Sequence, residues 1–179
     1  MNKLIKIRTF LDSISKSLGY ISAFFVLFLA LLILYNVISR YAFSSSLIFM
    51  QELEWHIFSL IFMLGLSYTL YNDAHVRVDI FYEKFSITLQ SIINIVGVLV
   101  FIIPLCVVIV YTSIESVMYA YDIGEGSPDP GGLPYRFIIK SLIPLAFVLL
   151  ILSSISFMIK QVENIVFHRQ TKHKKEDML

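Results

Sequence analysis

Four long runs of apolar residues constrain this chain more than any other feature of its sequence. Each run has about the 20 residues that a helix needs to cross the roughly 30 Å hydrocarbon core of a bilayer at about 1.5 Å per residue. None alternates with the two-residue period of a membrane barrel strand, so the pattern predicts helices. The predicted spans are Leu18–Ile38, Leu53–Tyr71, Ile87–Tyr111 and Phe137–Ile159.

The composition agrees with an integral membrane protein. Of 179 residues, 58% are hydrophobic and 15% are charged, whereas soluble domains average roughly 45–50% and about 25%. This excludes disorder and a disulfide scaffold, and the single cysteine, Cys106, has no partner for an internal disulfide. A net charge of +1 gives no electrostatic reason to bind nucleic acid. We expect residues 1–179 to form one all-α domain, a four-helix bundle in the lipid bilayer.

Lysine and arginine are unequally divided between the two sides of the predicted bundle. Eleven of the 14 lie before the first run, between the second and third, or after the fourth. The positive-inside rule therefore predicts cytoplasmic termini and outward-facing connections at Ser39–Glu52 and Thr112–Arg136. The first run exceeds the 7–15 residues of a signal-peptide core and lacks a small-residue cleavage site, so we expect a retained signal anchor.

The flanks and connections carry weaker patterns. Before the first run, apolar residues recur at helical spacing, at Leu4, Ile7, Leu11, Ile14 and Leu18. This stripe fits an amphipathic helix lying on the membrane surface and equally a simple extension of the first span. The Gly- and Pro-rich connection Asp122–Pro134 predicts consecutive turns. Residues 160–179 form a polar, basic tail.

Titratable residues gather where the first outward connection meets the second run. Glu52 and His56 lie four residues apart and share a helix face, with Glu54 and Trp55 between them. A charge at the bilayer centre costs about 2.5–3.5 kcal/mol on translocon scales, so a lipid-facing cluster of three such groups is unfavourable. We expect these three groups to contact protein, either Arg40 at the end of the first run or a partner subunit. Trp55 fits an aromatic anchor at the membrane interface.

Small and polar residues at helical spacing indicate close packing between the spans. These pairs are Asn36 with Arg40, Gly65 with Thr69, and Asn94 with Gly97. Pro104 and Pro144 lie inside runs, where each removes a backbone hydrogen bond and is expected to weaken its helix.

The connection between the second and third runs has an alternating pattern. If the segment is extended, His75, Arg77 and Asp79 lie on one side and valines lie on the other. These residues fit a solvated loop in which the positive charge of Arg77 helps only to set the orientation of the chain in the membrane. They also fit a segment that docks on protein through its valine side.

Signatures of enzymes are missing from the sequence. It contains no H-E-x-x-H zinc motif, no G-x-S-x-G nucleophile elbow and no P-loop. His56 is the one histidine inside a run, which disfavours a bis-histidine haem and hence the alternative of a small anchor or redox subunit of an enzyme complex. A self-sufficient transporter is disfavoured too, since there is no midplane charge or inverted repeat. We expect a non-enzymatic protein without a cofactor.

Three ordered segments carry a family resemblance. They are Ser39-Arg40-Tyr41 followed by Gln51-Glu52-Leu53-Glu54-Trp55, then His75-Val76-Arg77-Val78-Asp79, and last Glu125-Gly126-Ser127-Pro128 with Gly132-Leu133-Pro134 and Lys140 before Pro144. From about Val37 to Ile159, the chain resembles the DctQ-type small membrane subunit of tripartite ATP-independent periplasmic (TRAP) transporters. The resemblance rests on the order and spacing of these three segments and on their place among four spans.

This resemblance implies a subunit of a bacterial inner-membrane importer. A large DctM-type membrane subunit is expected to hold the substrate and sodium sites, and a periplasmic binding protein to deliver an organic acid. The small subunit is expected to brace the large one and to widen the outward docking surface, where Glu125 and Asp129 would meet basic residues. The resemblance also favours a docking role for His75, Arg77 and Asp79 over a solvated loop, and it singles out Ser127 and Lys140 as contact residues.

Overall fold

The computed structural model describes residues 2–44, 47–73 and 85–176, with side chains for residues 3–168 within these ranges. All regular structure there is helical. The elements are α1 (Asn2–Phe43), α2 (Ile48–Tyr71), α4 (Ile87–Gly97), the π-helical segment η1 (Val98–Ile102), α5 (Ile103–Asp122) and α6 (Phe137–Glu176). Within these ranges, four helical stretches are long and apolar enough to cross a membrane. The predicted four-span helical class is confirmed.

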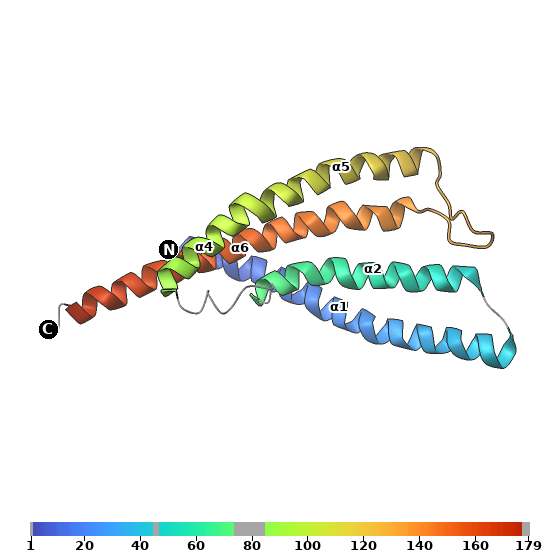
Figure 1. Ribbon diagram of the computed structural model, residues 1–179, viewed down its shortest axis with the longest axis horizontal. Helices are drawn as coiled ribbons and strands as arrows, with labels where there is room; N and C mark the ends of the chain where they lie inside the picture. Colours follow the sequence, from blue (N-terminus) through green and yellow to red (C-terminus); the bar gives the residue numbers. More distant parts are fainter. Residues whose placement is uncertain (1, 45–46, 74–84, 177–179) are drawn as a thin grey trace.

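The helices form two hairpins, one made of α1 and α2 and the other of α4, η1, α5 and α6 (Figure 1). The helix α6 contacts α1, α2, α4 and α5 and is therefore the central element. The hairpins lie close together near the two chain termini and diverge toward the α1–α2 and α5–α6 connections (Figure 1). We call these two regions the termini end and the loop end.

The helix α1 resolves the alternative left open for the N-terminal flank. It runs without a break through 42 residues, so the flank extends the first span. At about 1.5 Å per residue this helix is about 63 Å long, roughly twice the thickness of a bilayer core. The 40-residue α6 likewise continues past the predicted fourth span into the basic tail. The polar parts of both helices therefore extend beyond the apolar runs at the termini end.

The third span is longer than its apolar run and changes pitch within it. The expected effect of Pro104 is visible here, because the π-helical segment η1 ends two residues before the proline, and the Ile103 N–H pairs with the Val98 carbonyl. A proline has no N–H, so the normal helical pairing is lost at this point and a wider turn accommodates the gap. The helix α5 then continues past Tyr111 to Asp122. The predicted outward connection Thr112–Arg136 is thus helical in its first part, and its irregular part is residues 123–136.

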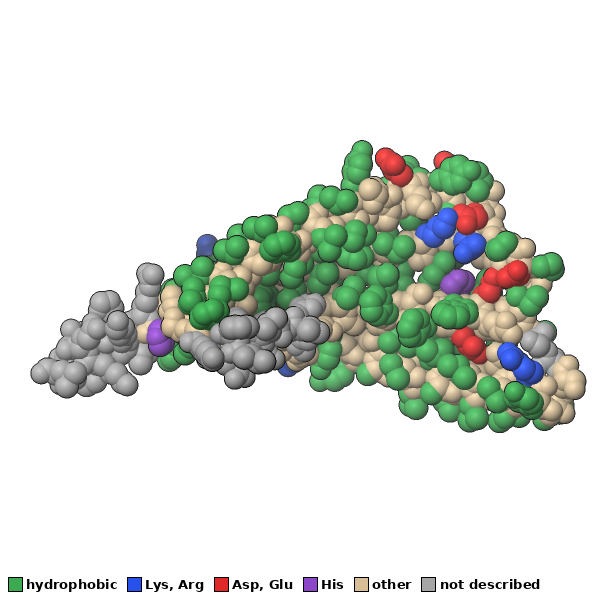
Figure 2. Space-filling model, viewed as in Figure 1, with side chains coloured by type: hydrophobic (Ala, Val, Ile, Leu, Met, Phe, Trp, Pro, Cys, Tyr) green, Lys and Arg blue, Asp and Glu red, His purple; other side chains and the backbone are tan. Residues whose placement is uncertain are grey.

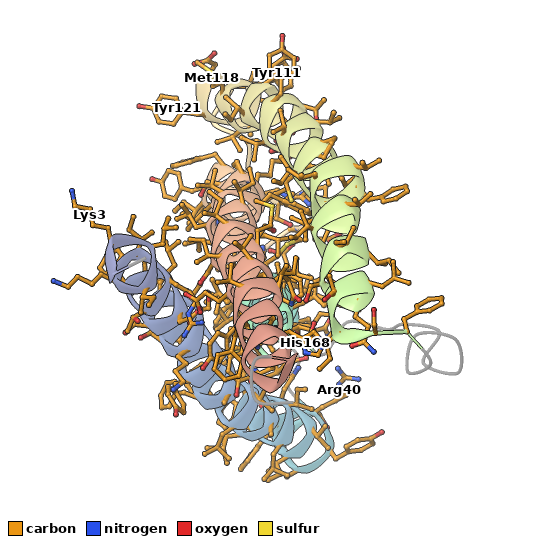
Figure 3. The ribbon with its side chains drawn as sticks, turned by 90° about the vertical axis from the view of Figure 1, so that its left-hand side faces the viewer. Lys3, Arg40, Tyr111, Met118, Tyr121 and His168 are labelled. Carbon is orange, nitrogen blue, oxygen red and sulfur yellow. The ribbon has the colours of Figure 1, made fainter. Side chains whose placement is uncertain are left out.

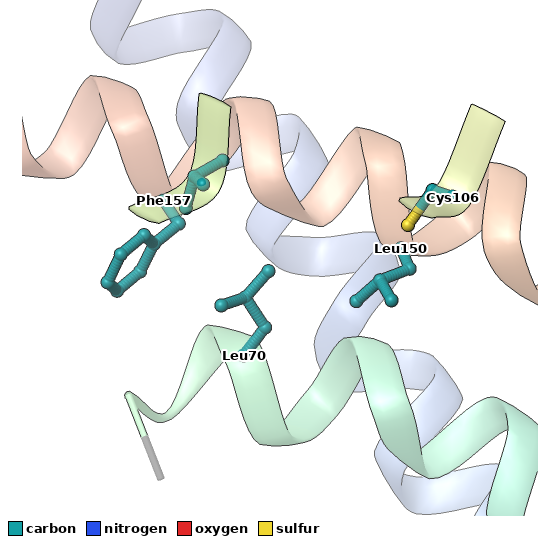
Figure 4. Packing of buried hydrophobic residues seen from close by; sticks show 5 residues of the cluster. Leu70, Cys106, Leu150 and Phe157 are labelled. Carbon is teal, nitrogen blue, oxygen red and sulfur yellow. The ribbon is translucent and has the colours of Figure 1, made fainter. Parts of the chain in front are cut away.

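The interior is small and contains many polar residues. Leu70, Val98, Cys106, Leu150 and Phe157 form the apolar core cluster between α2, α6 and the third span (Figure 4). Side chains at most 3% exposed also include the serines Ser15, Ser67, Ser91, Ser153, Ser154 and Ser156. Outward-facing side chains are mostly apolar, as Figure 2 shows for the region between the two ends and Figure 3 for Tyr111 and Met118 of α5. A polar interior with an apolar surface fits a lipid environment.

Candidate functional site

Glu52 of α2 holds the α5–α6 connection at the loop end. One carboxylate oxygen, Oε1, accepts a hydrogen bond from the Ser127 hydroxyl, and the other, Oε2, accepts one from the Leu133 N–H. The two loop residues are themselves paired, because the Ser127 N–H donates to the Leu133 carbonyl at 3.0 Å. Charge-assisted bonds of this kind are stronger than neutral ones. A single carboxylate thus fixes two points of a loop that lies more than 70 residues away along the chain.

A tight turn closes the loop beneath Glu52. The Gly132 N–H donates to the Asp129 carbonyl at 3.0 Å, and Gly131 has a φ of +85°, which favours glycine. A Cβ atom at Gly132 would collide with Ser127 and with the carboxylate of Glu52. The two glycines therefore let the backbone approach the carboxylate closely.

Glu125 joins the loop to the start of α6. Its carboxylate pairs with the Lys140 ammonium, and its other oxygen lies 3.8 Å from Nε of Arg136. Its backbone closes the same connection, because the Arg136 N–H donates to the Glu125 carbonyl at 2.9 Å. The structure therefore brings Glu52, Glu125, Ser127 and Lys140 into one loop-end cluster, all four of them residues singled out from the sequence.

The expected contact of Arg40 is made by a different residue. The side-chain amide of Asn36 donates to Oε1 of Glu54 at 2.7 Å and joins α1 to α2. Arg40, one turn further along α1, is exposed and makes no hydrogen bond or ion pair with another described residue. Asn36 is 6% exposed, so the buried polar group of this helix, and not the exposed charge, holds the two helices together.

Trp55 and His56 occupy different environments although they are adjacent in sequence. Trp55 is 69% exposed and packs edge-on against Phe58, a position that suits an interfacial anchor. His56 is half-buried and lies where α2 faces α6, beside two hollows in the surface. His75, Arg77 and Asp79 lie outside the described residues.

A second polar cluster lies at the termini end, between α1 and α6. The Asp12 carboxylate accepts a hydrogen bond from Ser156 at 2.6 Å and lies 3.6 Å from Nε of Arg8. Arg8 also pairs with Glu163 of α6. One turn further along α1, the Ser15 and Ser153 hydroxyls are 2.7 Å apart. We refer to these residues as the termini-end cluster.

The residues of the termini-end cluster were not among those predicted from the sequence. A signal was available, since Arg8 and Asp12 are spaced four apart on one helix face, and three serines interrupt the apolar run near residue 155. The sequence does not indicate which helix these residues contact, because their pairing depends on how α1 crosses α6.

These features define a class of protein. The chain is a multispan helical membrane protein whose polar contacts gather at two ends. Within the described ranges, no group of three His, Cys, Asp or Glu side chains is placed to hold a metal ion.

Comparison with known families identifies the chain more narrowly. The family described as the DctQ component of tripartite ATP-independent periplasmic transporters matches residues 29–164. This match covers well over half of the chain, so the protein belongs to the DctQ family, as the resemblance predicted. It is a small permease component of a TRAP transporter and not an enzyme. A search of curated proteins found no match.

Proposed function

We propose that this chain braces the large membrane subunit of a TRAP transporter in the bacterial inner membrane, for sodium-coupled uptake of an organic acid delivered by a periplasmic binding protein. The observation that carries the proposal is the family match across residues 29–164, which reaches into all four spans. The substrate and sodium sites are assigned to the large subunit.

The proposed orientation puts the termini end in the cytoplasm. Eleven of the 14 lysines and arginines lie before the first span, between the second and third spans or after the fourth, which supports this orientation by the positive-inside rule. Reporter fusions at the C-terminus and at Gly126 in the α5–α6 connection test it directly. They should report opposite sides of the membrane, and the same side for both would refute the orientation.

The loop end is then the surface offered to the binding protein. Glu52 and the Glu125–Lys140 pair hold residues 123–136 in one conformation, which lowers the conformational entropy lost when a partner docks. The exposed Asp129 carboxylate would attract a basic patch on that partner and raise the association rate more than the final affinity.

Reconstitution in liposomes tests the bracing role. The large subunit with its binding protein should transport poorly without this chain, and this chain alone should transport nothing. Full uptake in its absence would refute the role. Replacing the sodium gradient with a potassium gradient should abolish uptake if the coupling ion is sodium.

A point variant tests the docking surface separately. Glu52→Gln should raise the binding-protein concentration needed for half-maximal uptake while leaving assembly with the large subunit intact. Glu115→Gln is a matched control, because Glu115 is an exposed carboxylate on α5 that makes no hydrogen bond or ion pair within the described ranges. If the two variants need the same binding-protein concentration for half-maximal uptake, residues 123–136 do not form the docking surface.

A further inference from the structure

An apolar groove lies between α2 and α6 toward the loop end, where the two hairpins begin to diverge (Figure 1). Its volume is about 500 Å³. The walls are mostly aliphatic and include Leu53, Ile57 and Leu60 of α2 with Ile138, Leu142 and Leu145 of α6. A hollow lined in this way does not hold ordered water, because it offers few hydrogen-bond partners.

A polar groove of about 420 Å³ adjoins the apolar one. His56 and Ile139 line both hollows, so an apolar and a polar hollow adjoin at these two residues. The polar groove also borders Trp55, whose exposed ring fits the headgroup level of a bilayer. The apolar part therefore lies on the side of the hydrocarbon and the polar part on the side of the headgroups.

One cation and one anion on the polar groove are available to a ligand. Arg136 is 42% exposed, and its contact with Glu125 is a long one through Nε, so the guanidinium keeps donors for another acceptor. The Asp129 carboxylate is exposed and makes no hydrogen bond or ion pair with another described residue. Both oxygens of Glu52, in contrast, are already engaged by the loop.

We propose that this paired groove binds a phospholipid with a primary-amine zwitterionic headgroup, of the phosphatidylethanolamine type. An acyl chain fills the apolar groove, the phosphate accepts hydrogen bonds from Arg136, and the ammonium donates to Asp129. Guanidinium groups bind phosphate in a fixed fork geometry. A quaternary ammonium has no N–H to donate, and an anionic headgroup without an amine would face the Asp129 carboxylate unpaired.

The size of the groove favours a lipid over a helix of a partner subunit. A helix with its side chains is about 10–12 Å across, and α2 and α6, which form the walls of the groove, already contact one another. A single acyl chain is much thinner and can lie between their side chains. This inference requires the chain to be in a membrane but does not depend on the transporter partners.

Native mass spectrometry of the purified full chain tests the proposal. The protein is equilibrated with an equimolar mixture of phosphatidylethanolamine, phosphatidylcholine and phosphatidylglycerol in detergent, and the retained lipid is measured. We expect phosphatidylethanolamine to be retained about tenfold over each competitor, as the loss of one charge-assisted contact predicts. Equal retention of all three lipids would refute the headgroup assignment.

Three variants and one control variant separate headgroup recognition from loop folding. Asp129→Asn should remove the preference for phosphatidylethanolamine over phosphatidylcholine while total lipid retention persists. Arg136→Gln should lower retention of all three, whereas Arg40→Gln, which removes an exposed arginine at the same end, should not. Leu142→Trp fills the apolar groove from α6 and should lower lipid retention without changing the contacts of the α5–α6 connection.

Lipid retention is also measured on the complex with the large subunit, to test whether a helix of that subunit occupies the groove instead. Retention of phosphatidylethanolamine in the complex, still sensitive to Leu142→Trp, supports the lipid. Loss of the lipid on assembly, together with a crosslink from position 142 to the large subunit, would show that a partner helix fills the groove and would overturn the proposal.

Discussion

The two ends of this molecule use polar side chains in different ways. At the termini end, side chains of α1 and α6 meet one another, as Asp12 meets Ser156 and Arg8 meets Glu163. At the loop end, a carboxylate of α2 accepts a backbone N–H and a hydroxyl from a connection between two other helices. The first arrangement joins helices to each other, and the second gives a loop its shape.

The difference follows from where the helices converge. At the termini end the hairpins lie close together, so side chains can bridge two helices directly (Figure 1). At the loop end they diverge, and a connection that spans the opening needs its own anchors. We therefore expect substitutions at the termini end to lower global stability and substitutions at the loop end to act locally.

The largest expected effect concerns the close approach of α1 and α2. A Cβ atom at Gly19 would overlap the ring of Tyr68, so Gly19→Ala should destabilise the protein by about 1–3 kcal/mol. Thermal unfolding in detergent measures this. Gly97→Ala is the matched control, because its Cβ meets nothing within 4 Å, and it should be neutral or stabilising. Similar melting temperatures for both variants would contradict the close approach.

The next effect concerns the contact between α1 and α6. Asp12→Ala removes the carboxylate that accepts the Ser156 hydrogen bond and lies near Nε of Arg8, which keeps its pair with Glu163, and should lower the free energy of unfolding by about 1–2 kcal/mol. A double-mutant cycle with Ser156→Ala measures the interaction free energy between Asp12 and Ser156. If the effects of the two substitutions are additive, the Asp12–Ser156 hydrogen bond contributes nothing to stability and does not help to join α1 to α6.

A smaller effect is expected where α1 meets α2 near the loop end. Asn36→Ala removes the bond to Glu54 and should cost about 0.6 kcal/mol, the average for polar contacts between membrane helices. Arg40→Ala should leave the melting temperature of the isolated chain unchanged. The reverse order of the two effects would restore Arg40 as the contact that the sequence led us to expect.

The smallest effect on global stability is expected from Glu52→Gln. A glutamine has an NH2 group in place of one carboxylate oxygen, so it cannot offer an acceptor at both positions where Ser127 and Leu133 donate. The melting temperature should stay near that of the native chain, while proteinase K cleavage within residues 123–136 should become faster. A large drop in melting temperature would mean that both ends stabilise the fold in the same way.

The residues of the loop-end cluster were predictable, but their pairing was not. Glu52, Glu125, Ser127 and Lys140 stood out from the sequence as polar groups at the ends of apolar runs or as parts of a family pattern. That Ser127 would meet Glu52, 75 residues away, depends on the crossing of α2 and α6. Arg40 shows the same limit, since Asn36 lies one turn earlier and faces Glu54 instead.

The sequence by itself determined the number of spans, their approximate limits and the family. Hydropathy summed over about 20 residues is a local property, and it measures the transfer of a helix into lipid whatever its neighbours are. Only the tertiary structure decided that Asp12 meets Ser156, that Glu52 holds the α5–α6 connection and that an amphipathic groove opens between α2 and α6. Such contacts depend on the rotation and crossing of whole helices, which the packing of all the helices sets together.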